Sequence, residues 1–296
     1  TKVGTTTTNT VTPIKQENQY TNLLPMFHAK MALNEKSNLR FAYTSTFSRA
    51  NFSDLNPGEN IDMTQSIPTI TRGNTALKPT KSQNFDLMYE HYFDNLGIVS
   101  GGLIYKKLQD IVFSNRSIET ISGTNYVLTQ ATNISDGNLF GFEVGVNRRL
   151  NFLPGFLSGL GVEANYTYIQ SEAKVPVIGT SRYDVTELPN QSKHLYNAIL
   201  FYEKNGVMLR LAGNFRGASL ETINQSLGKD FYTYTGKNFT LDASASVQVS
   251  KRIKAFVELN NLNNEPLKTY MGDERRVTMV EWYSSRGQVG IRWELF

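Results

Sequence analysis

Apolar and polar side chains alternate along most of the segments of this sequence that favour regular structure. A period of two places successive side chains on opposite faces of a β-strand, so each such segment predicts a strand with one apolar and one polar face. Leu160, Val162 and Ala164, for instance, alternate with Gly161 and Glu163. Almost no segment shows the 3.6-residue period of an amphipathic helix. The sequence therefore predicts an all-β, antiparallel protein.

Eleven segments carry this alternation and are rich in Tyr, Phe, Val and Thr, which favour strands. They cover Met26–Leu33, Leu39–Ser48, Gln83–Phe93, Ile98–Phe113, Leu139–Leu150, Leu157–Ser171, Lys193–Tyr202, Val207–Phe215, Phe239–Val249, Ile253–Leu259 and Gln288–Phe296. Lys2–Thr12 is a twelfth candidate. We therefore expect about 11–12 strands.

The connections between these segments alternate between two kinds. Short turns contain the Asn, Asp, Gly, Pro or Ser that hairpins favour. Long polar connections lie between them, over Arg49–Ser82, Ser114–Asn138, Glu172–Ser192, Arg216–Asn238 and Leu262–Gly287. Outer-membrane β-barrels place short turns at one end and long loops at the other. The pattern thus favours a transmembrane barrel, with a large soluble up-and-down β-protein as the alternative.

Charged residues fall almost entirely on the polar faces of the predicted strands. A charge on the lipid face near the membrane midplane would cost about 2–4 kcal/mol, which favours a barrel with an apolar exterior and a polar lumen. Alternation alone cannot distinguish this from a soluble protein that buries the apolar faces, but aromatic residues also gather near the strand ends, as in membrane girdles. Arg148 and Lys107 are exceptions to the pattern. The lumen-facing candidates are Arg40, Asp86, Glu90, Glu143, Glu163, Arg210, Asp242, Glu258 and Arg292.

The composition excludes several classes of protein. No run of about 18 apolar residues occurs, so no helical membrane span is expected. The absence of Cys excludes disulfides, thiolate-held zinc, iron–sulfur clusters and cysteine nucleophiles. The net charge of +4 is small and its basic residues are scattered, so no nucleic-acid partner is expected.

No residue pattern predicts an enzyme, a metal site or a cofactor. His28, His91 and His194 have no spacing that suggests a shared metal ion. Ser192 near His194 is the nearest approach to a hydrolase set, and no nucleophile elbow accompanies it. We therefore expect no catalytic residues.

Several motifs together resemble the barrel of TonB-dependent outer-membrane transporters. One is the run Ile70–Pro79, Ile-Thr-Arg-Gly-Asn-Thr-Ala-Leu-Lys-Pro, followed by Asn84–Glu90; Thr75 stands where the family commonly has Pro. Others are Gly102–Lys107 with Asp110-Ile111, Gly141-Phe142-Glu143, Asn165–Tyr168, Asn260–Pro266 and the closing Gly290–Phe296. Phe296 resembles the terminal aromatic signal of outer-membrane proteins. The order and spacing of these motifs cover nearly the whole chain.

This resemblance implies a fold and a function. Such transporters have 22-strand barrels that enclose a plug, so residues 1–296 are expected to be the C-terminal portion of a barrel whose plug and N-terminal strands lie upstream. The implied function is active import of a scarce nutrient across the outer membrane of a Gram-negative cell, energised through TonB. The implied partners are outer-membrane lipid, the missing plug and N-terminal barrel half, the TonB complex and a surface lipoprotein. The nine lumen-facing charges would contact the plug.

The resemblance also indicates where a ligand would bind. The family takes up metal chelates, cobalamin, oligosaccharides or peptide fragments through its extracellular loops, and the strand motifs favour carbohydrate here. The loop aromatics that could stack on a ligand are Tyr183, Tyr232, Tyr234, Tyr270, Trp282 and Tyr283; such residues also pack at barrel mouths. A passive porin-like or assembly barrel and a surface β adhesin are the alternative functions.

Overall fold

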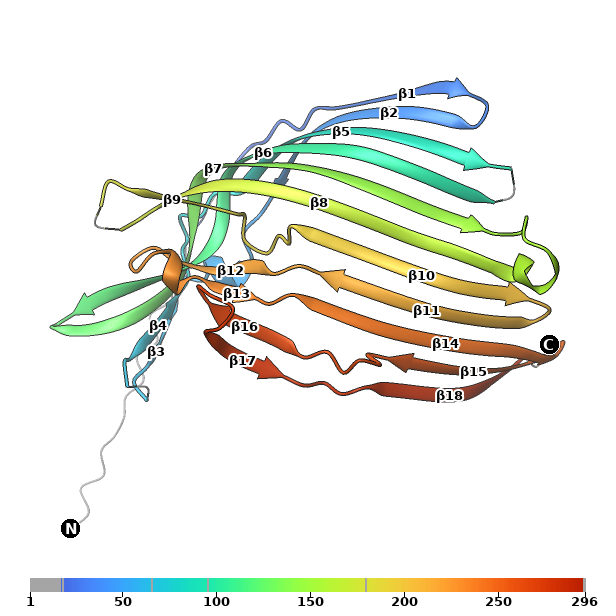
Figure 1. The fold of residues 1–296 in the computed structure, drawn as a ribbon. Coiled ribbons are helices and arrows are strands. Elements are labelled where there is room, and N and C mark those ends of the chain that lie inside the picture. The colour runs from blue at the N-terminus through green and yellow to red at the C-terminus, as the bar shows by residue number, and fades with distance from the viewer. Residues whose placement is uncertain (1–16, 18, 65, 95, 179, 295–296) are drawn as a thin grey trace, which may run out of the picture.

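Eleven long antiparallel strands, here called the wall strands, form one curled sheet (Figure 1). The computed structural model describes residues 17, 19–64, 66–94, 96–178 and 180–294. In spatial order the wall strands are β1 (Met26–Asn34), β2 (Ser37–Ser48), β5 (Thr80–Phe93), β6 (Gly97–Ile121), β7 (Thr124–Arg149), β8 (Leu160–Pro176), β10 (His194–Lys204), β11 (Val207–Arg216), β14 (Asn238–Ser250), β15 (Ile253–Asn260) and β18 (Arg286–Trp293). This confirms the predicted all-β barrel fold and all eleven predicted strands. The candidate strand Lys2–Thr12 and the terminal Phe296 lie outside the described residues.

Shorter elements gather at the end of the sheet where the long connections lie (Figure 1). They are α1 (Phe52–Leu55), β3 (Glu59–Asp62), β4 (Thr69–Arg72), β9 (Tyr183–Thr186), β12 (Ser219–Asn224), η2 (Lys229–Phe231), β13 (Thr233–Thr235), β16 (Leu267–Met271) and β17 (Val277–Glu281). We call this end the mouth. The short turns lie at the opposite end, with the 3₁₀ turn η1 (Gly155–Gly159). No helix in the described part of the chain is long and apolar enough to cross a membrane.

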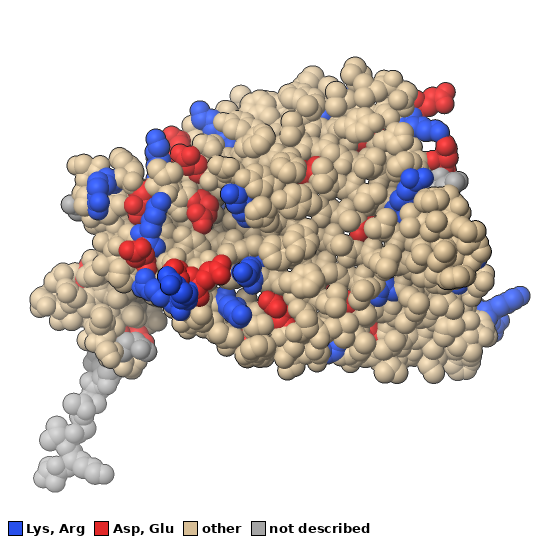
Figure 2. Space-filling view, viewed as in Figure 1, with Lys and Arg blue, Asp and Glu red and all other residues tan. Residues whose placement is uncertain are grey.

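The register of the wall strands sorts side chains onto two chemically different faces. Directly paired residues share a face, and one row of partners runs Phe41, Leu87, Leu103 and Phe142. The adjacent row, on the opposite face, runs Arg40, Met88, Gly102 and Glu143. Figure 2 shows that few charged side chains appear over the middle of the wall strands on one face, whereas Lys, Arg, Asp and Glu gather towards the mouth and also occur at the turn end.

The polar face is the inner, concave face of the sheet. Strand β12 follows β11 in the chain, yet it pairs in parallel with β6 through Ile223 and Asn115. Strands β7, β8 and β10 lie between β6 and β11 in the sheet, so β12 can reach β6 only by crossing the concave side. Leu220 and Ile223 of β12 pack there against Leu139, which lies on the face of Glu143. The apolar face therefore points outwards.

A compact hydrophobic core lies on the inner face at the mouth. Ile223, Leu220, Val175 and Tyr232 are 0% exposed within it. They pack with Ile111, Phe113, Ile134, Leu139, Ala173 and Leu188. The inner face is therefore apolar at this end, because the loops between wall strands fold inwards and bury apolar side chains that would otherwise contact water.

Strands β6 and β7 extend through most of the region predicted as the loop Ser114–Asn138, so that prediction is wrong. Asp110 adopts a left-handed conformation with φ 52°. Before it the inner face carries even-numbered residues such as Leu108, and after it the buried residues are Ile111 and Phe113. At Asp110 the inward-facing residues change from even-numbered to odd-numbered, which interrupts the alternation on which the strand prediction depended. The pairing of β6 with β7 nevertheless continues to a turn at Ser122-Gly123.

The first and last wall strands, β1 and β18, form the two edges of the sheet. Within the described residues, β1 pairs only with β2 among the wall strands, and β18 pairs only with β15. Side chains of the edge strand β18 are highly exposed, with Val289 at 84% and Ile291 at 73%. The sheet is therefore a barrel wall that is open along these two edges. Unpaired backbone N–H and C=O groups at such an edge are costly in lipid.

Candidate functional site

A pocket opens on the inner face of the mouth, over β16 and β17. Its volume is about 440 Å³, within the range of small-molecule sites. Lys268 pairs with Val280, and Tyr234 pairs with Tyr270, so each pair shares a face of the small mouth sheet formed by β12, β13, β16 and β17, and Tyr234 packs there against the hydrophobic core. The residues that line the pocket are Gly236, Lys237, Glu265, Lys268, Thr269, Tyr270, Glu274, Val277, Val280 and Trp282. We call this the mouth pocket.

The mouth pocket combines apolar walls with a charged rim. Val277, Val280 and the rings of Tyr270 and Trp282 supply the apolar surface, and the Trp282 side chain is 62% exposed. At the rim, the Lys237 ammonium lies 3.8 Å from a Glu274 carboxylate oxygen. Among the described residues, no carboxylate lies within 4.0 Å of the Lys268 ammonium. The pocket can therefore stack a planar or sugar-like group and offer a cation to an anionic one.

The ring of Tyr270 is held in place by the ring of Tyr234 of β13, which lies between it and the hydrophobic core. The two rings stack with centroids 5.2 Å apart and an interplanar angle of 9°. Tyr234 also packs against the hydrophobic core. Burial raises the pKa of Tyr234 to about 12, with a further contribution from Glu187. Burial likewise raises the pKa of Tyr270, followed by the charge of Glu274. Both phenols are therefore neutral hydrogen-bond donors at physiological pH.

The structure separates the six aromatic residues predicted as ligand contacts. Tyr270 and Trp282 line the mouth pocket, and Tyr234 lies beneath it. Tyr232 is completely buried, and its hydroxyl donates a hydrogen bond of 3.0 Å to Asp184 Oδ2. Burial, and then that hydrogen bond, raise the pKa of Tyr232. Tyr183 and Tyr283 are exposed and do not line the mouth pocket.

Sequence reasoning missed Lys268 and Lys237, whereas Glu274 and the two valines lie in the loop Thr269–Glu281, where ligand contacts were expected without these residues being singled out. Lys268 lies two residues before Tyr270, so alternation along a strand would have placed both on one face. The segment was interpreted as a loop, however, because its strands have only five residues each. Lys237 reaches the pocket through the pairing of β13 with β16, which no local pattern indicates.

The hairpin of β16 and β17 is docked onto the hydrophobic core through its turn. The Gly272 N–H donates to the Tyr232 carbonyl at 2.8 Å, and Arg276 Nη1 donates to the Asp230 carbonyl at 2.7 Å. Asp273 accepts from the Arg275 guanidinium at 2.9 and 3.0 Å. These bonds, with the Arg275 backbone N–H, lower the pKa of Asp273 to about 2. The turn therefore holds one wall of the mouth pocket in place.

Gly272→Ala is expected to detach this hairpin. Gly272 has φ 69°, and an added Cβ would lie 2.5 Å from the Asp230 carbonyl oxygen. Gly123→Ala is the matched control, because Gly123 has φ 82° with no atom within 4 Å of the added Cβ. Both variants bear the strain of a left-handed residue, about 1 kcal/mol, but only Gly272→Ala also meets backbone. We expect faster amide hydrogen exchange over residues 267–281 in that variant alone. Equal exchange in both variants would contradict the docking.

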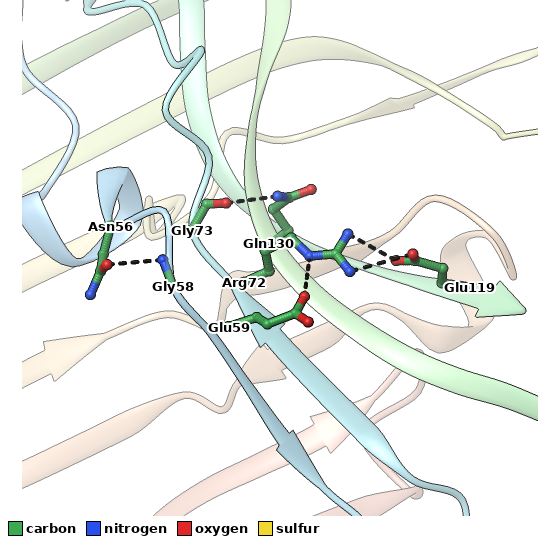
Figure 3. Close-up of polar contacts among 7 residues, drawn as sticks. All are labelled: Asn56, Gly58, Glu59, Arg72, Gly73, Glu119 and Gln130. Atoms are coloured by element: carbon green, nitrogen blue, oxygen red, sulfur yellow. Dashed lines mark hydrogen bonds and ion pairs between the residues drawn. The ribbon is translucent and has the colours of Figure 1, made fainter. Parts of the chain in front are cut away.

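A second polar junction fixes the loop between β2 and β5 (Figure 3). Arg72 of β4 donates through Nε to Glu59 at 2.9 Å and through Nη1 to Glu119 of β6 at 3.2 Å. Gln130 of β7 donates to the Gly73 carbonyl at 2.9 Å. The hydrogen bond to Glu59 raises the pKa of Arg72. These contacts attach the β3–β4 hairpin to the extended β6–β7 hairpin.

The junction gives the Gly73-Asn74 motif a physical explanation. A Cβ on Gly73 would lie 1.9 Å from the Asn56 carbonyl oxygen, so only glycine fits. Asn74 donates through its side chain to the Ala131 carbonyl at 3.0 Å, and its backbone N–H donates to the Asp54 carbonyl. Leu77, three residues on, is buried. The motif is therefore a docking element that joins this loop to β7.

All nine charges predicted to face the lumen lie on the inner face by register. Arg40 Nε donates to Glu90 at 2.9 Å, and Gln288 donates to Glu258 at 2.6 Å. Asp242 accepts the Asn261 backbone N–H at 2.8 Å, which gives it a structural contact in the mouth-side half of β14. In the described ranges, no three His, Asp or Glu side chains are grouped so that they could hold a metal ion.

The curled antiparallel sheet, its apolar exterior, its polar interior and its inward-folded mouth loops define an outer-membrane barrel wall. The family model "TonB dependent receptor-like, beta-barrel" matches residues 1–262. The chain belongs to this family, which is found in the outer membrane of Gram-negative bacteria and consists of transporters rather than enzymes. The resemblance noted in the sequence is thereby confirmed. No protein of curated function matches the sequence.

Solved structures of siderophore receptors share the fold. A mutant of the ferric enterobactin receptor of Pseudomonas aeruginosa superposes with a TM-score of 0.59 and 16% identity over 90% of this chain. The siderophore receptor PirA of Acinetobacter baumannii gives 0.59 and 14% over 91%. The ferric-catecholate import receptor Fiu of E. coli gives 0.58 and 15% over 90%. The chain spans 39%, 40% and 34% of these three proteins, respectively.

Proposed function

We propose that residues 1–296 form the C-terminal portion of the barrel of a receptor that imports a scarce nutrient across the outer membrane, energised through TonB. The observation that carries this proposal is the mouth: the loops fold inwards onto the inner face and form a pocket there. Membership of the family supports a plug inside the barrel and a TonB partner for it. The nine inner-face charges are then positioned to contact the plug.

The ligand that this proposal favours is a ferric siderophore, and the mouth pocket is its contact on this chain. The structural neighbours named above are receptors for ferric enterobactin, for a siderophore and for ferric catecholates. The chemistry of the pocket is compatible with such a ligand, since aromatic walls can stack on catechol rings and lysines attract an anionic chelate. An oligosaccharide is the second candidate, because exposed rings such as that of Trp282 also stack on sugar faces.

Trp282→Ala in the full-length protein is expected to weaken ligand binding about tenfold, the loss of one aromatic stacking contact. Affinity for ferric catecholate siderophores and for oligosaccharides is measured separately on the purified receptor. Phe52→Ala is the control, because Phe52 is 88% exposed in α1 and does not line the mouth pocket. If a strain that has only this receptor for both ligand classes took up neither of them, the proposed import function would be overturned. Uptake with an unchanged affinity in Trp282→Ala would overturn only the pocket.

A further inference from the structure

The mouth loops are joined into one sheet by pairings that the rest of the wall does not make. In the small mouth sheet, β17 pairs with β16, β16 with β13, and β13 with β12. Strand β12 then pairs in parallel with β6, β6 with β7, and β7 in parallel with β4, which pairs with β3. Within the described residues, β3 and β17 each have one partner strand, so they are the two edges of this extended mouth sheet.

The two edges differ in whether they resist further pairing. Strand β3, Glu59-Asn60-Ile61-Asp62, carries two carboxylates in four residues, and charged side chains are a common means of blocking an edge. Strand β17, Val277-Thr278-Met279-Val280-Glu281, has neither Lys nor Pro, and its two valines are exposed. An apolar edge of this kind is a template for an added strand, which gains main-chain hydrogen bonds there. The unprotected edge is therefore β17.

The free edge of β17 lies on the same side as the free edge of the wall. The last three wall strands are β14, β15 and β18, and the last three strands of the mouth sheet are β13, β16 and β17. Both series end at one margin, where β17 and β18 are the outermost strands (Figure 1). The four residues 282–285 connect them. A strand that paired with the free side of β18 would thus arrive beside β17.

The directions of the strands allow one partner for both. Arg286 of β18 pairs with Asn260 at the mouth, and Trp293 pairs with Ile253 at the turn end, so β18 runs away from the mouth. Strand β17 is antiparallel to β16 and runs the same way as β18 (Figure 1). An antiparallel neighbour of β18 would run towards the mouth and could continue antiparallel along β17. Strands β6 and β7 continue beyond the wall in this manner within this chain.

The mouth pocket reaches this edge. Val277 and Val280 of β17 line the pocket, and so does Trp282, the first residue after the strand. All three side chains are exposed. On its other side the pocket is bounded by Lys268 of β16 and by Gly236 next to β13. A strand added to β17 would place its own side chains next to the two valines, and the pocket would gain a wall where it is now open.

We propose that the upstream strand which closes the wall against β18 continues past the membrane, pairs antiparallel with β17 and completes the mouth pocket. This inference rests on the proposed function in one respect, namely that an upstream part of the same polypeptide closes the barrel. The chain spans 34–40% of the three receptors compared above. Because unpaired backbone groups of β18 would be costly in lipid, a partner strand is required at this margin. An apolar side chain of that strand faces Val280.

Residue-resolved hydrogen exchange tests the pairing in the full-length protein that contains this chain, purified in detergent without ligand. Successive N–H groups of an antiparallel strand point to opposite sides, so an edge strand leaves about every second one unpaired. If β17 has a second partner, all N–H groups of residues 277–281 are expected to exchange at least about tenfold more slowly than those of Ser122 and Gly123, after correction for intrinsic rates. The turn at Ser122-Gly123 is the internal reference.

Cross-linking identifies the partner. The photoreactive residue p-benzoylphenylalanine replaces Val280 of β17 or Ile291 of β18 in the full-length protein, and the linked peptides are sequenced by mass spectrometry. We expect both probes to link to one segment upstream of Thr1 in the same polypeptide, with the Ile291 site preceding the Val280 site, because the partner runs towards the mouth. The control position is Leu200, which lies on the outer face of β10 within the wall. A probe there is expected to link to no upstream segment.

Two results would overturn the inference. One is exchange of every second N–H group of residues 277–281 as fast as in the reference turn, which is decisive even if the substituted proteins do not assemble. The other is a link from Val280 to a second copy, to another protein or to a segment different from the one linked to Ile291. Failure of the proposed function is distinguishable, since it would appear as the lack of any upstream link from Ile291 itself.

Discussion

Leu211→Arg is expected to prevent assembly of the barrel in the membrane. Leu211 lies in the middle of β11 on the outer face, where it pairs with Leu200 and Ala243. An arginine on the lipid face near the midplane costs about 2–4 kcal/mol, a large fraction of the stability of a typical protein. The measurement is the amount of heat-modifiable, folded barrel in isolated outer membranes. We expect a loss of most of the folded species.

The control for this substitution is its neighbour in the chain. Ala212 lies on the inner face, where it pairs with Ile199 and Asp242, two residues from the native Arg210. Ala212→Arg introduces the same charge beside a carboxylate and away from lipid, so we expect folded barrel at close to wild-type amounts. If both variants assembled equally well, the assignment of the two faces would be wrong.

Tyr232→Ala is expected to unfold the mouth loops and to leave the wall intact. The Tyr232 ring is completely buried among Leu220, Ile223 and Val175. Truncation of a buried aromatic residue to alanine costs about 3–5 kcal/mol. Tyr232 is the largest of the fully buried side chains, so its truncation leaves the largest cavity that a single substitution can make in this core. We expect rapid hydrogen exchange over residues 216–238, and loss of ligand binding through the mouth pocket above it.

Two variants separate the packing of Tyr232 from its hydrogen bond. Tyr232→Phe keeps the ring and removes only the donor to Asp184, which is expected to cost about 1–3 kcal/mol because it leaves the carboxylate without this partner. Phe52→Ala removes an exposed ring and is expected to leave exchange in the mouth loops unchanged. Unchanged exchange in Tyr232→Ala would show that the hydrophobic core does not hold the loops.

The wall could be predicted from the sequence because lipid on one side and water on the other impose the same two-residue period on every strand. Leu160, Val162 and Ala164 alternate with their polar neighbours for this reason alone, without any long-range information. The mouth could not be predicted in the same way. The parallel pairing of Ile223 with Asn115 and the burial of Tyr232 arise from contacts between segments far apart in the chain. Strands of three to five residues such as β13 and β16 are too short to show a period.

For the candidate site, the sequence predicted the type of residue that lines the pocket, but only some of the positions. Tyr270 and Trp282 were singled out because aromatic residues in loops can stack on ligands, and both line the mouth pocket. The same criterion also selected Tyr232, which is buried, since composition alone cannot distinguish a ring that faces solvent from one that packs. Lys268 was missed because its segment was interpreted as a loop, since β16 and β17 have only five residues each.

The left-handed residue Asp110 has a consequence for how such a protein can vary. The side chains that face inwards change from even-numbered to odd-numbered residues at this one position. Beyond Asp110, the β6–β7 hairpin therefore packs against the mouth loops and does not face lipid. Residues inserted in matched pairs beyond Asp110 would lengthen the hairpin and alter what it contacts outside the cell. The spacing of side chains within the bilayer would be untouched, so selection at the surface can act independently of selection for membrane insertion.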